Sequence, residues 1–386
     1  MFTQSSDSAP NSETRYAYID ALRGIAILGV LLVHASYWVY PKTPLLGSLA
    51  AMGARGVQLF YVVSALTIFM SLSARRQEKN TYFAFFVRRF FRIAPLFYLS
   101  ILIYFSYMWM EPRYWCPEGL GWWHYLSSAL FINGWSPTTI NAVVPGGWSI
   151  AIEMSFYLIA PLLFLYVKKI RVACVLLVVS MAFSLVSTEW VTEYFSARYP
   201  SEQQYLVKHF SFAWFFSQLP LFEFGLILYL IMNRDVAGRK VPSMELSNKE
   251  LKWMHPLLCI ALCVLFLLLG VYSTFAEYAF SHFVFGAAFL FLVLSMSKVR
   301  LSMLNNPVTR FLGKVSFSIY LLHLAILDTF KPWFSKSILF QGDMGFFVAF
   351  TFLLAVSAAI AFFSYRYIEQ PGISLGKFLL SRYRKE

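Results

Sequence analysis

The first apolar segment of the chain, residues 18–40, carries three ionisable side chains that could do chemistry: Asp20, Arg23 and His34. Arg23 and His34 are 11 residues apart, so in a helix they share one face and lie about 16 Å apart along the axis. An ionisable group in the middle of a membrane span costs about 2.5–3.5 kcal/mol and needs a partner or a function. The pair is either a snorkelling arginine with a hydrogen-bonded buried histidine, or a cation on the path to a catalytic imidazole.

A second group of basic residues, Arg88, Arg89 and Arg92, directly precedes an apolar run over residues 93–110. Side chains three and four residues apart are neighbours on a helix surface. Guanidinium groups bind phosphate through two N–H bonds at once, so this cluster suits a phosphate-rich ligand. The other interpretation is ordinary topology, because basic residues gather at the cytoplasmic ends of membrane helices.

A lone carboxylate, Glu153, lies about two turns into the apolar segment 147–167. It could orient or charge-compensate an imidazole, or it could pair with an intramembrane arginine, and the two are compatible. Further ionisable groups have supporting roles in our interpretation. These are Asp20 in the first segment, His323 in mid-segment, and Arg366 with Glu369, whose i,i+3 spacing predicts a structural ion pair at the cytoplasmic surface.

The elements that must position these residues follow from composition. Of the 386 residues, 59% are hydrophobic and 13% charged, against about 45–50% and 25% in soluble domains. We therefore expect an all-α, polytopic membrane helix bundle. About ten segments are long and apolar enough to span a bilayer: 18–40, 46–72, 93–110, 147–167, 172–188, 210–232, 257–275, 278–297, 316–334 and 344–366.

The net charge of +13 is explained by topology and indicates no nucleic-acid partner. With both termini cytoplasmic, 23 of the 32 Lys and Arg residues fall on inside segments and 6 on outside ones, as the positive-inside rule predicts. The outside loop 111–146 is rich in Trp and Tyr, which form either an interfacial belt or a stacking surface for a sugar. We divide the chain into a polar leader (1–15), a membrane domain (16–371) and a basic cytoplasmic tail (372–386). No metal-ligand spacing is present.

Taken in order, these motifs resemble the bacterial acyltransferase-3 family of integral membrane O-acyltransferases. The similarity runs from about residue 16 to 371 and also takes in GVQLFYVVSALTIF (56–69), QLPLFEFG, SFSIYLLH and SYRYIEQP. Each motif alone is weak, but seven in the same order are specific. The matching functional positions are the R-x10-H of Arg23 and His34, the R-x-x-R of Arg89 and Arg92, and the Trp-Ser…Glu of Trp148, Ser149 and Glu153.

The resemblance implies a stand-alone enzyme of the bacterial inner membrane, without the esterase-like domain that some members carry. It implies transfer of an acyl group, most often acetyl, from cytoplasmic acyl-CoA to a hydroxyl of a surface glycan, such as O-antigen or exopolysaccharide, or of a lipid-linked saccharide. No permanently bound cofactor is expected.

The resemblance also implies site roles. His34 would act as general base or transient acyl carrier, supported by Arg23 and Glu153. The donor would be bound by Arg23, Arg89, Arg92, Trp148 and Ser149. The rival hypothesis is a transporter or flippase of a glycan or lipid, for which intramembrane charges are also typical.

Overall fold

The computed structural model describes residues 17–108, 110–233, 256–277, 279–299, 301–336 and 341–383. The predicted leader, the end of the basic tail and several basic residues of the topology argument lie outside these ranges. Helices and turns make up the described part, which contains no β-strand. The helices are α2 (Ala17–Ala35), α3 (Pro44–Met52), η1 (Gly53–Arg55), α4 (Gly56–Ala74), α5 (Thr81–Met108), α6 (Trp122–Ala129), η2 (Asn133–Trp135), α7 (Trp148–Tyr166), α8 (Ile170–Ser196), η3 (Ser201–Gln203), α9 (Gln204–Ala213), α10 (Phe215–Met232), α11 (Pro256–Phe275), α12 (Ser281–Lys298), α13 (Pro307–Lys314), α14 (Ser316–Lys336), α15 (Gly342–Ser364), η4 (Tyr365–Glu369) and α16 (Gln370–Tyr383).

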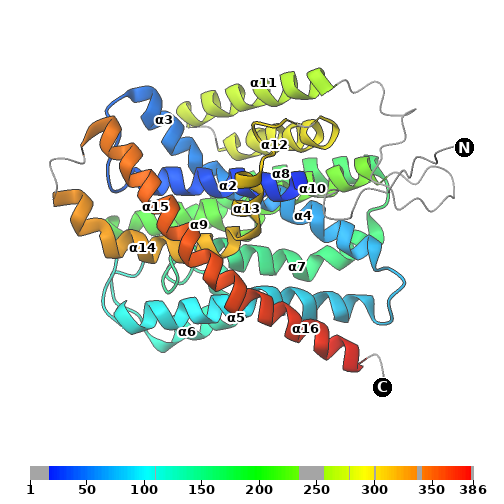
Figure 1. Cartoon of the computed structure of the whole chain (residues 1–386), viewed down its shortest axis with the longest axis horizontal. Coiled ribbons are helices and arrows are strands. Elements are labelled where there is room, and N and C mark those ends of the chain that lie inside the picture. Colours follow the sequence, from blue (N-terminus) through cyan, green and yellow to red (C-terminus); the bar gives the residue numbers. More distant parts are fainter. Residues whose placement is uncertain are drawn as a thin grey trace, which may run out of the picture.

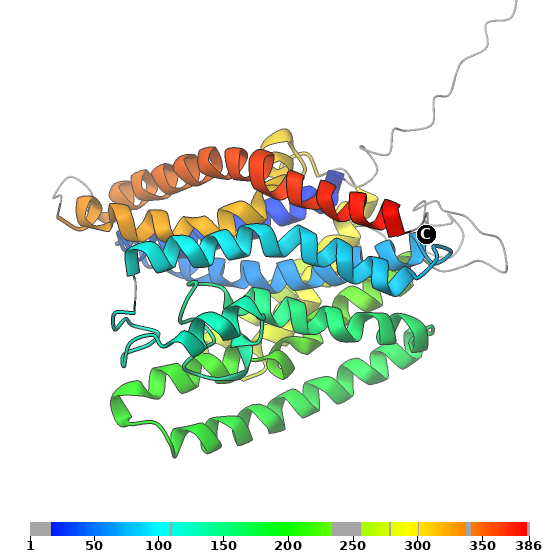
Figure 2. The same ribbon diagram turned by 90° about the horizontal axis from the view of Figure 1, so that it is seen from below.

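Most of the long helices run side by side along the longest axis of the molecule (Figures 1 and 2). Within the described ranges, eight helical stretches are long and apolar enough to cross a membrane, and the bent pair α13–α14 makes a ninth. The remaining expected span, 93–110, coincides with the second half of α5. The prediction of an all-α membrane bundle is confirmed.

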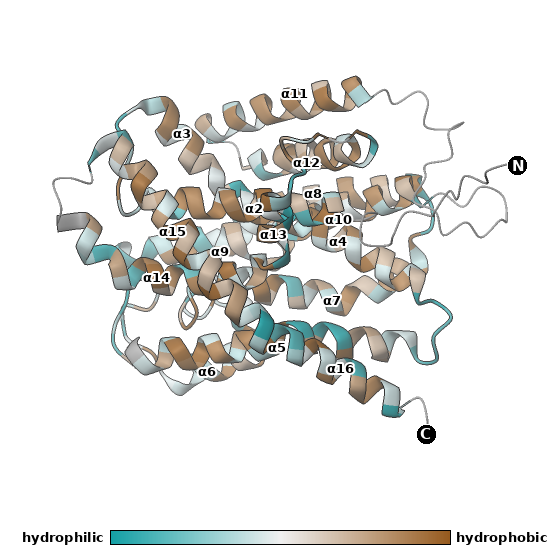
Figure 3. Cartoon of the chain, viewed as in Figure 1, coloured by the Kyte–Doolittle hydropathy of each residue, from teal (hydrophilic) through white to brown (hydrophobic). Residues whose placement is uncertain are grey.

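The apolar surface is distributed as a membrane requires. Long helices such as α11 and α15 are coloured mainly as hydrophobic, whereas hydrophilic residues gather at turns and around α13 and the middle of α5 (Figure 3). In the most apolar windows of α8 and α11 only 22% of the residues are buried inside the protein. These two helices therefore present most of their side chains to lipid.

A tight crossing of α13 over α2 holds the polar half of α2 in place. Pro307 follows the capping residue Asn306, whose side chain accepts from two backbone N–H groups, so α13 begins sharply. A bend of 77° then separates α13 from α14. At the crossing, a Cβ on Gly24 would lie 1.9 Å from the carbonyl oxygen of Thr309, and one on Gly313 would lie 1.7 Å from that of Asp20. Only glycine allows the two backbones to approach this closely.

Candidate active site

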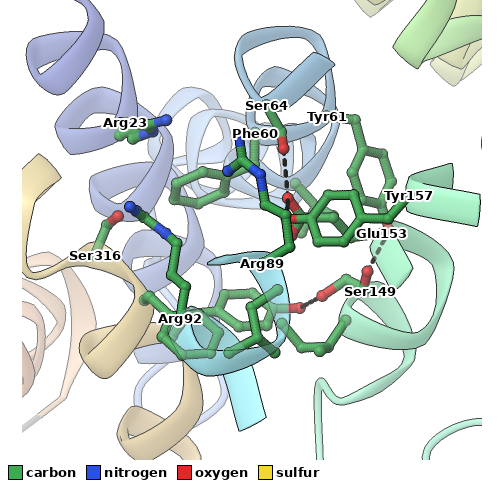
Figure 4. A pocket seen from close by; sticks show the side chains of 15 residues that line it. Arg23, Phe60, Tyr61, Ser64, Arg89, Arg92, Ser149, Glu153, Tyr157 and Ser316 are labelled. Carbon is green, nitrogen blue, oxygen red and sulfur yellow. Dashed lines mark hydrogen bonds between the residues drawn. The ribbon is translucent and has the colours of Figure 1, made fainter. Parts of the chain in front are cut away.

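A polar cavity of about 90 Å³ lies inside the bundle, where α2, α4, α5, α7 and α14 converge. Figure 4 shows its lining side chains turned toward one another from these five helices. The cavity brings together five residues that the sequence predicts as functional. These are Arg23, Arg89, Arg92, Ser149 and Glu153.

The acidic group of this cavity is Glu153, which is held by two hydroxyl groups. Its Oε1 accepts a hydrogen bond from the Tyr157 hydroxyl at 2.7 Å and another from Ser64 Oγ. Tyr157 lies one turn further along α7, whereas Ser64 belongs to α4. A buried carboxylate needs such donors, since an unsatisfied one is costly in an apolar interior.

Basic side chains form the opposite part of the wall. Arg23 pairs with Asp20 at 3.5 Å and donates to Thr67 Oγ1 at 3.2 Å. Arg92 faces Arg23 across the cavity (Figure 4) and belongs to none of the salt bridges of the described residues. Two guanidinium groups facing each other at low dielectric repel, so this space favours an anion.

Arg89 completes the basic wall and is held by aromatic rings. Its guanidinium carbon lies 5.7 Å from the ring centre of Phe85 and 5.6 Å from that of Tyr157. Cation–π contacts of this kind fix a guanidinium without neutralising it. The N–H groups of Arg89 therefore keep capacity to bind a ligand.

His34 lies further along α2 and does not line this cavity. Its Nδ1 is 2.7 Å from the carbonyl oxygen of Val30. A carbonyl can only accept, so Nδ1 carries the hydrogen, and the lone pair of the neutral ring is on Nε2. The ring packs edge-on against that of His323, with 4.8 Å between centroids and 71° between planes. An imidazole with a free Nε2 is suited to act as a base.

His323 is held in the same tautomer by the backbone of α14. Its Nδ1 lies 2.8 Å from the carbonyl oxygen of Tyr320 and 3.1 Å from that of Ile319. The side chain is completely buried, and its Nε2 has no hydrogen-bond partner in the described part of the chain. A buried acceptor without a donor is unfavourable by about 1–3 kcal/mol, and such groups call for a functional explanation.

Tyr320 links the cavity to the imidazole pair. Its hydroxyl lies in the cavity wall, where it accepts from Ser149 Oγ at 2.8 Å and donates to the carbonyl oxygen of Gly146 at 3.0 Å. The same ring lies 5.9 Å from that of His323. One helix, α14, thus joins the basic cavity to His34.

Comparison with known proteins decides the family. A family model described as an acyltransferase domain, Acyl_transf_3, matches residues 16–366. The chain belongs to the acyltransferase-3 family. The resemblance seen in the sequence is confirmed, and the chain is a membrane O-acyltransferase.

Individual members of this family and related proteins are distant in sequence. Acyltransferase MdmB of Streptomyces mycarofaciens is 25% identical over 82% of this chain and 80% of its own. Peptidoglycan O-acetyltransferase OatA of Listeria monocytogenes is 27% identical over 45% of this chain, a match that spans only 28% of OatA. Regulator of hypoxia-inducible factor 1 of Caenorhabditis elegans is 21% identical over 92% of this chain and 78% of its own. No solved structure matches the chain.

Two expectations about this acyltransferase-3 site, that Glu153 contacts His34 and that Trp148 lines the donor site, differ from the structure. Glu153 bonds to hydroxyl groups of α4 and α7, and none of the contacts of the described residues joins it to His34. The neighbour of His34 is His323, which the sequence assigned only a supporting role. Trp148 lies outside the cavity, with its ring 6.4 Å from that of Tyr61 and 5.9 Å from that of His209.

The ion pair predicted between Arg366 and Glu369 needs correction. It is absent from the salt bridges of the described residues. Both residues lie in η4, a π-helical turn, which changes the angular spacing of an ordinary helix. Glu369 is consequently buried and accepts a hydrogen bond from Ser318 Oγ, whereas Arg366 is exposed.

Five polar residues of the cavity wall were not predicted as functional: Tyr61, Ser64, Tyr157, Ser316 and Tyr320. Tyr157 follows Glu153 by four residues, so helical spacing could have paired them. Ser64 and Tyr320 come from helices far away in the sequence. No local pattern signals their convergence on Glu153 and Ser149.

Proposed function

We propose that this acyltransferase moves an acyl group, in the first place acetyl, from cytoplasmic acyl-CoA to a hydroxyl of a cell-surface glycan or lipid-linked saccharide. The observation that carries the proposal is the convergence of Arg23, Arg89 and Arg92 on one intramembrane cavity. Asp20 pairs with Arg23 and Glu153 lies in the same wall, so the three guanidinium groups leave the site formally positive by one charge, which favours an anionic ligand. The phosphates of CoA are anionic, and arginine binds phosphate in a bidentate manner.

The size of the cavity limits which part of the donor it holds. Its volume of about 90 Å³ is below the roughly 300–1,000 Å³ typical of small-molecule sites. It therefore accepts a single group such as a phosphate, while the nucleotide part of CoA extends toward the cytoplasm and the acyl arm extends along α2 to His34. The basic first half of α5 supplies the cationic approach in this arrangement.

The acyl transfer step is assigned to His34. Nε2 takes the proton of the acceptor hydroxyl while the oxygen attacks the thioester carbonyl, the C–S bond breaks, and the proton passes to the CoA sulfur. In the second form of the mechanism, Nε2 attacks the thioester carbonyl, the C–S bond breaks and the CoA thiolate leaves. The acceptor hydroxyl then attacks the acyl group on the imidazole, its proton passes to the thiolate, and Nε2 is released. Both forms need the free Nε2 that the Nδ1 hydrogen bond to Val30 leaves.

The acceptor reaches His34 from the end of α2 opposite Arg23. Tyr37 lies on this side, with its ring 5.3 Å from that of His34 and 64% of its surface exposed. Further exposed aromatic rings belong to the loop region around α6, among them Tyr114, Trp122 and Trp123. Aromatic faces of this kind suit the apolar faces of sugar rings, and the name of OatA supports a glycan acceptor.

The proposal places the chain in the bacterial inner membrane with both termini in the cytoplasm. This orientation lets the arginines meet cytoplasmic acyl-CoA while Tyr37 faces the outside. Membership of the acyltransferase-3 family supports the enzyme over the transporter hypothesis.

The test uses washed membranes that contain the protein and receive radiolabelled acetyl-CoA. Label in a glycan or a lipid-linked saccharide, together with a mass increase of one acetyl group in surface glycans of wild-type but not deletion cells, is the expected result. Movement of glycan across the membrane without transfer of label would overturn the proposal in favour of the transporter.

A further inference from the structure

A second, larger cavity lies away from the basic site and has no part in the proposed reaction. Its volume is about 700 Å³, and it is enclosed by α8, α9, α10 and the start of α12. It shares no lining residue with the smaller cavity. A space of this size lies within the roughly 300–1,000 Å³ of ligand sites. α8, its outer wall, runs along one edge of the bundle (Figure 2).

The inner wall of α8 is a ridge of hydroxyl-bearing residues. Ser184, Thr188, Thr192 and Ser196 line the cavity at intervals of four residues, a spacing that forms one ridge of a helix. Thr192 Oγ1 lies 2.7 Å from both the Thr188 carbonyl oxygen and Ser211 Oγ. Thr188 Oγ1 accepts from Trp214 Nε1 at 3.3 Å, so both threonine hydroxyls have partners and their methyl groups can contact an apolar ligand. From Ser184 to Ser196 the ridge extends about 18 Å.

Two exposed aromatic rings of α8 lie beside this cavity and mark the level of the lipid headgroups. Trp190 and Tyr194, on the same part of α8, are 63% and 41% exposed and stack with 5.6 Å between ring centres. Exposed Trp and Tyr gather at the membrane–water interface. The ridge runs about 15 Å inward from Tyr194 to Ser184, half of the roughly 30 Å hydrocarbon core of a bilayer.

Two opposite charges line the cavity near the aromatic pair and have no salt-bridge partner in the described structure. Glu189 on α8 and Lys208 on α9 both line the cavity, are exposed, and take part in none of the salt bridges of the described residues. An anionic ligand alone would be repelled by Glu189, and a cationic one by Lys208. A headgroup that carries both charges is complementary to the pair.

We propose that this cavity is a binding site for one zwitterionic phospholipid of the phosphatidylethanolamine class. One acyl chain lies along the inner part of the α8 ridge, from Glu189 toward Ser184, with the phosphate at Lys208 and the ammonium group at Glu189. The site is independent of the acyl transfer reaction, and the lipid fills the space between α8 and the rest of the bundle.

The first test measures lipid that remains with the purified protein, by native mass spectrometry or by extraction. Wild type should retain about one phosphatidylethanolamine per chain. Leu185→Trp fills the cavity and should lower this amount at least about fivefold. The matched control is Val186→Trp, which adds the same ring at a lipid-facing position, 69% exposed, and should retain the lipid. Equal retention in the two variants, or none in wild type, would overturn the proposal.

The second test addresses the headgroup in nanodiscs that contain equal amounts of phosphatidylethanolamine and phosphatidylglycerol. Wild type should enrich the former about three- to fivefold, as expected for exposed charge pairs. Glu189→Gln should abolish the enrichment, and the double exchange Glu189→Lys with Lys208→Glu should restore it, because both charges are again present. Enrichment that persists in Glu189→Gln, or that favours phosphatidylglycerol, would contradict the charge assignment. Preferential retention of a lipid-linked saccharide would contradict the phospholipid assignment and identify the cavity as a site for the acceptor substrate.

Discussion

The imidazole rings of His34 and His323 lie edge to face, 4.8 Å apart, although they come from opposite ends of the chain. Each Nδ1 donates to a backbone carbonyl of its own helix. The basic atom of each neutral ring is therefore Nε2. His323 Nε2 is buried without a donor in the described structure, so it is available to stabilise a proton gained by His34.

This relationship predicts that His323 positions His34 and stabilises its protonated form. Replacement by Phe should lower kcat about 10- to 100-fold, the usual effect of losing a residue that supports a functional histidine. The KM for acyl-CoA should stay the same, because the donor phosphates bind elsewhere. His323→Gln keeps an acceptor near the position of Nε2 and should recover part of the rate. Steady-state kinetics in detergent would test this, with His124→Gln in the outer loop as the control. An unchanged kcat in His323→Phe would exclude the role.

For the basic cavity, we expect substitutions to change the KM for acyl-CoA, in contrast to the effect on kcat expected for His323. Arg92→Ala should raise the KM for acyl-CoA about 10-fold or more, since a hydrogen bond to a charged group contributes about 1.5–3 kcal/mol. The effect should fall with increasing salt. Arg76, an exposed arginine of the α4–α5 turn, supplies the control, and Arg76→Ala should leave KM within twofold. Equal KM values for the Arg92 and Arg76 variants would remove Arg92 from the donor site.

For Glu153 the prediction concerns the direction in which the KM for acyl-CoA changes. The change Glu153→Gln keeps an oxygen for the hydroxyls of Ser64 and Tyr157 but removes a negative charge beside the arginines. The cavity becomes more positive, so the KM for acyl-CoA should fall. Glu153→Ala should destabilise the fold by about 1–3 kcal/mol, because two buried hydroxyls lose their acceptor. Isothermal titration with CoA and thermal unfolding in detergent measure the two effects. Weaker CoA binding by Glu153→Gln would show that Glu153 contacts the donor directly.

The crossing of α2 and α13 predicts a strong effect of a single methyl group. Gly24→Ala places a Cβ 1.9 Å from the Thr309 carbonyl oxygen, which the backbone can relieve only by moving the helices apart. Overpacking of this kind is unfavourable by about 1–3 kcal/mol or more. The Tm in detergent should fall clearly, whereas Gly121→Ala should leave it unchanged, because its nearest contact is 3.9 Å away. Equal Tm values would show that the crossing is loosely packed.

Much of the architecture could be predicted from the sequence, because each expected span depends on local composition. All ten expected segments fall on helices, although 93–110 is only part of α5, 46–72 takes in α3, η1 and α4, and 210–232 contains the break between α9 and α10. The break between α13 and α14 was not predicted. It depends on the capping of α13 and on its contact with α2, and hydropathy carries no information about either.

Part of the site could also be predicted, because ionisable residues in apolar segments are visible in the local sequence. Intramembrane charges are rare and expensive, so Arg23, Arg89, Arg92 and Glu153 stand out in the sequence, and the structure brings them together. Pairings between distant helices leave no local signal. The contact of His34 with His323, and that of Glu153 with Ser64, could therefore only be found in the structure. The π-helical turn before Gln370 likewise changed the expected geometry of the Arg366–Glu369 pair.

The central claim is that Nε2 of His34 carries out acyl transfer, and the rate of label transfer from radiolabelled acetyl-CoA to acceptor in proteoliposomes tests it most directly. Wild type, His34→Gln and the control His124→Gln are compared at equal amounts of correctly inserted protein. The account predicts that His34→Gln loses at least about a hundredfold in rate, as expected for removal of a general base, while the control matches wild type. Transfer by His34→Gln within a few-fold of wild type would contradict the account.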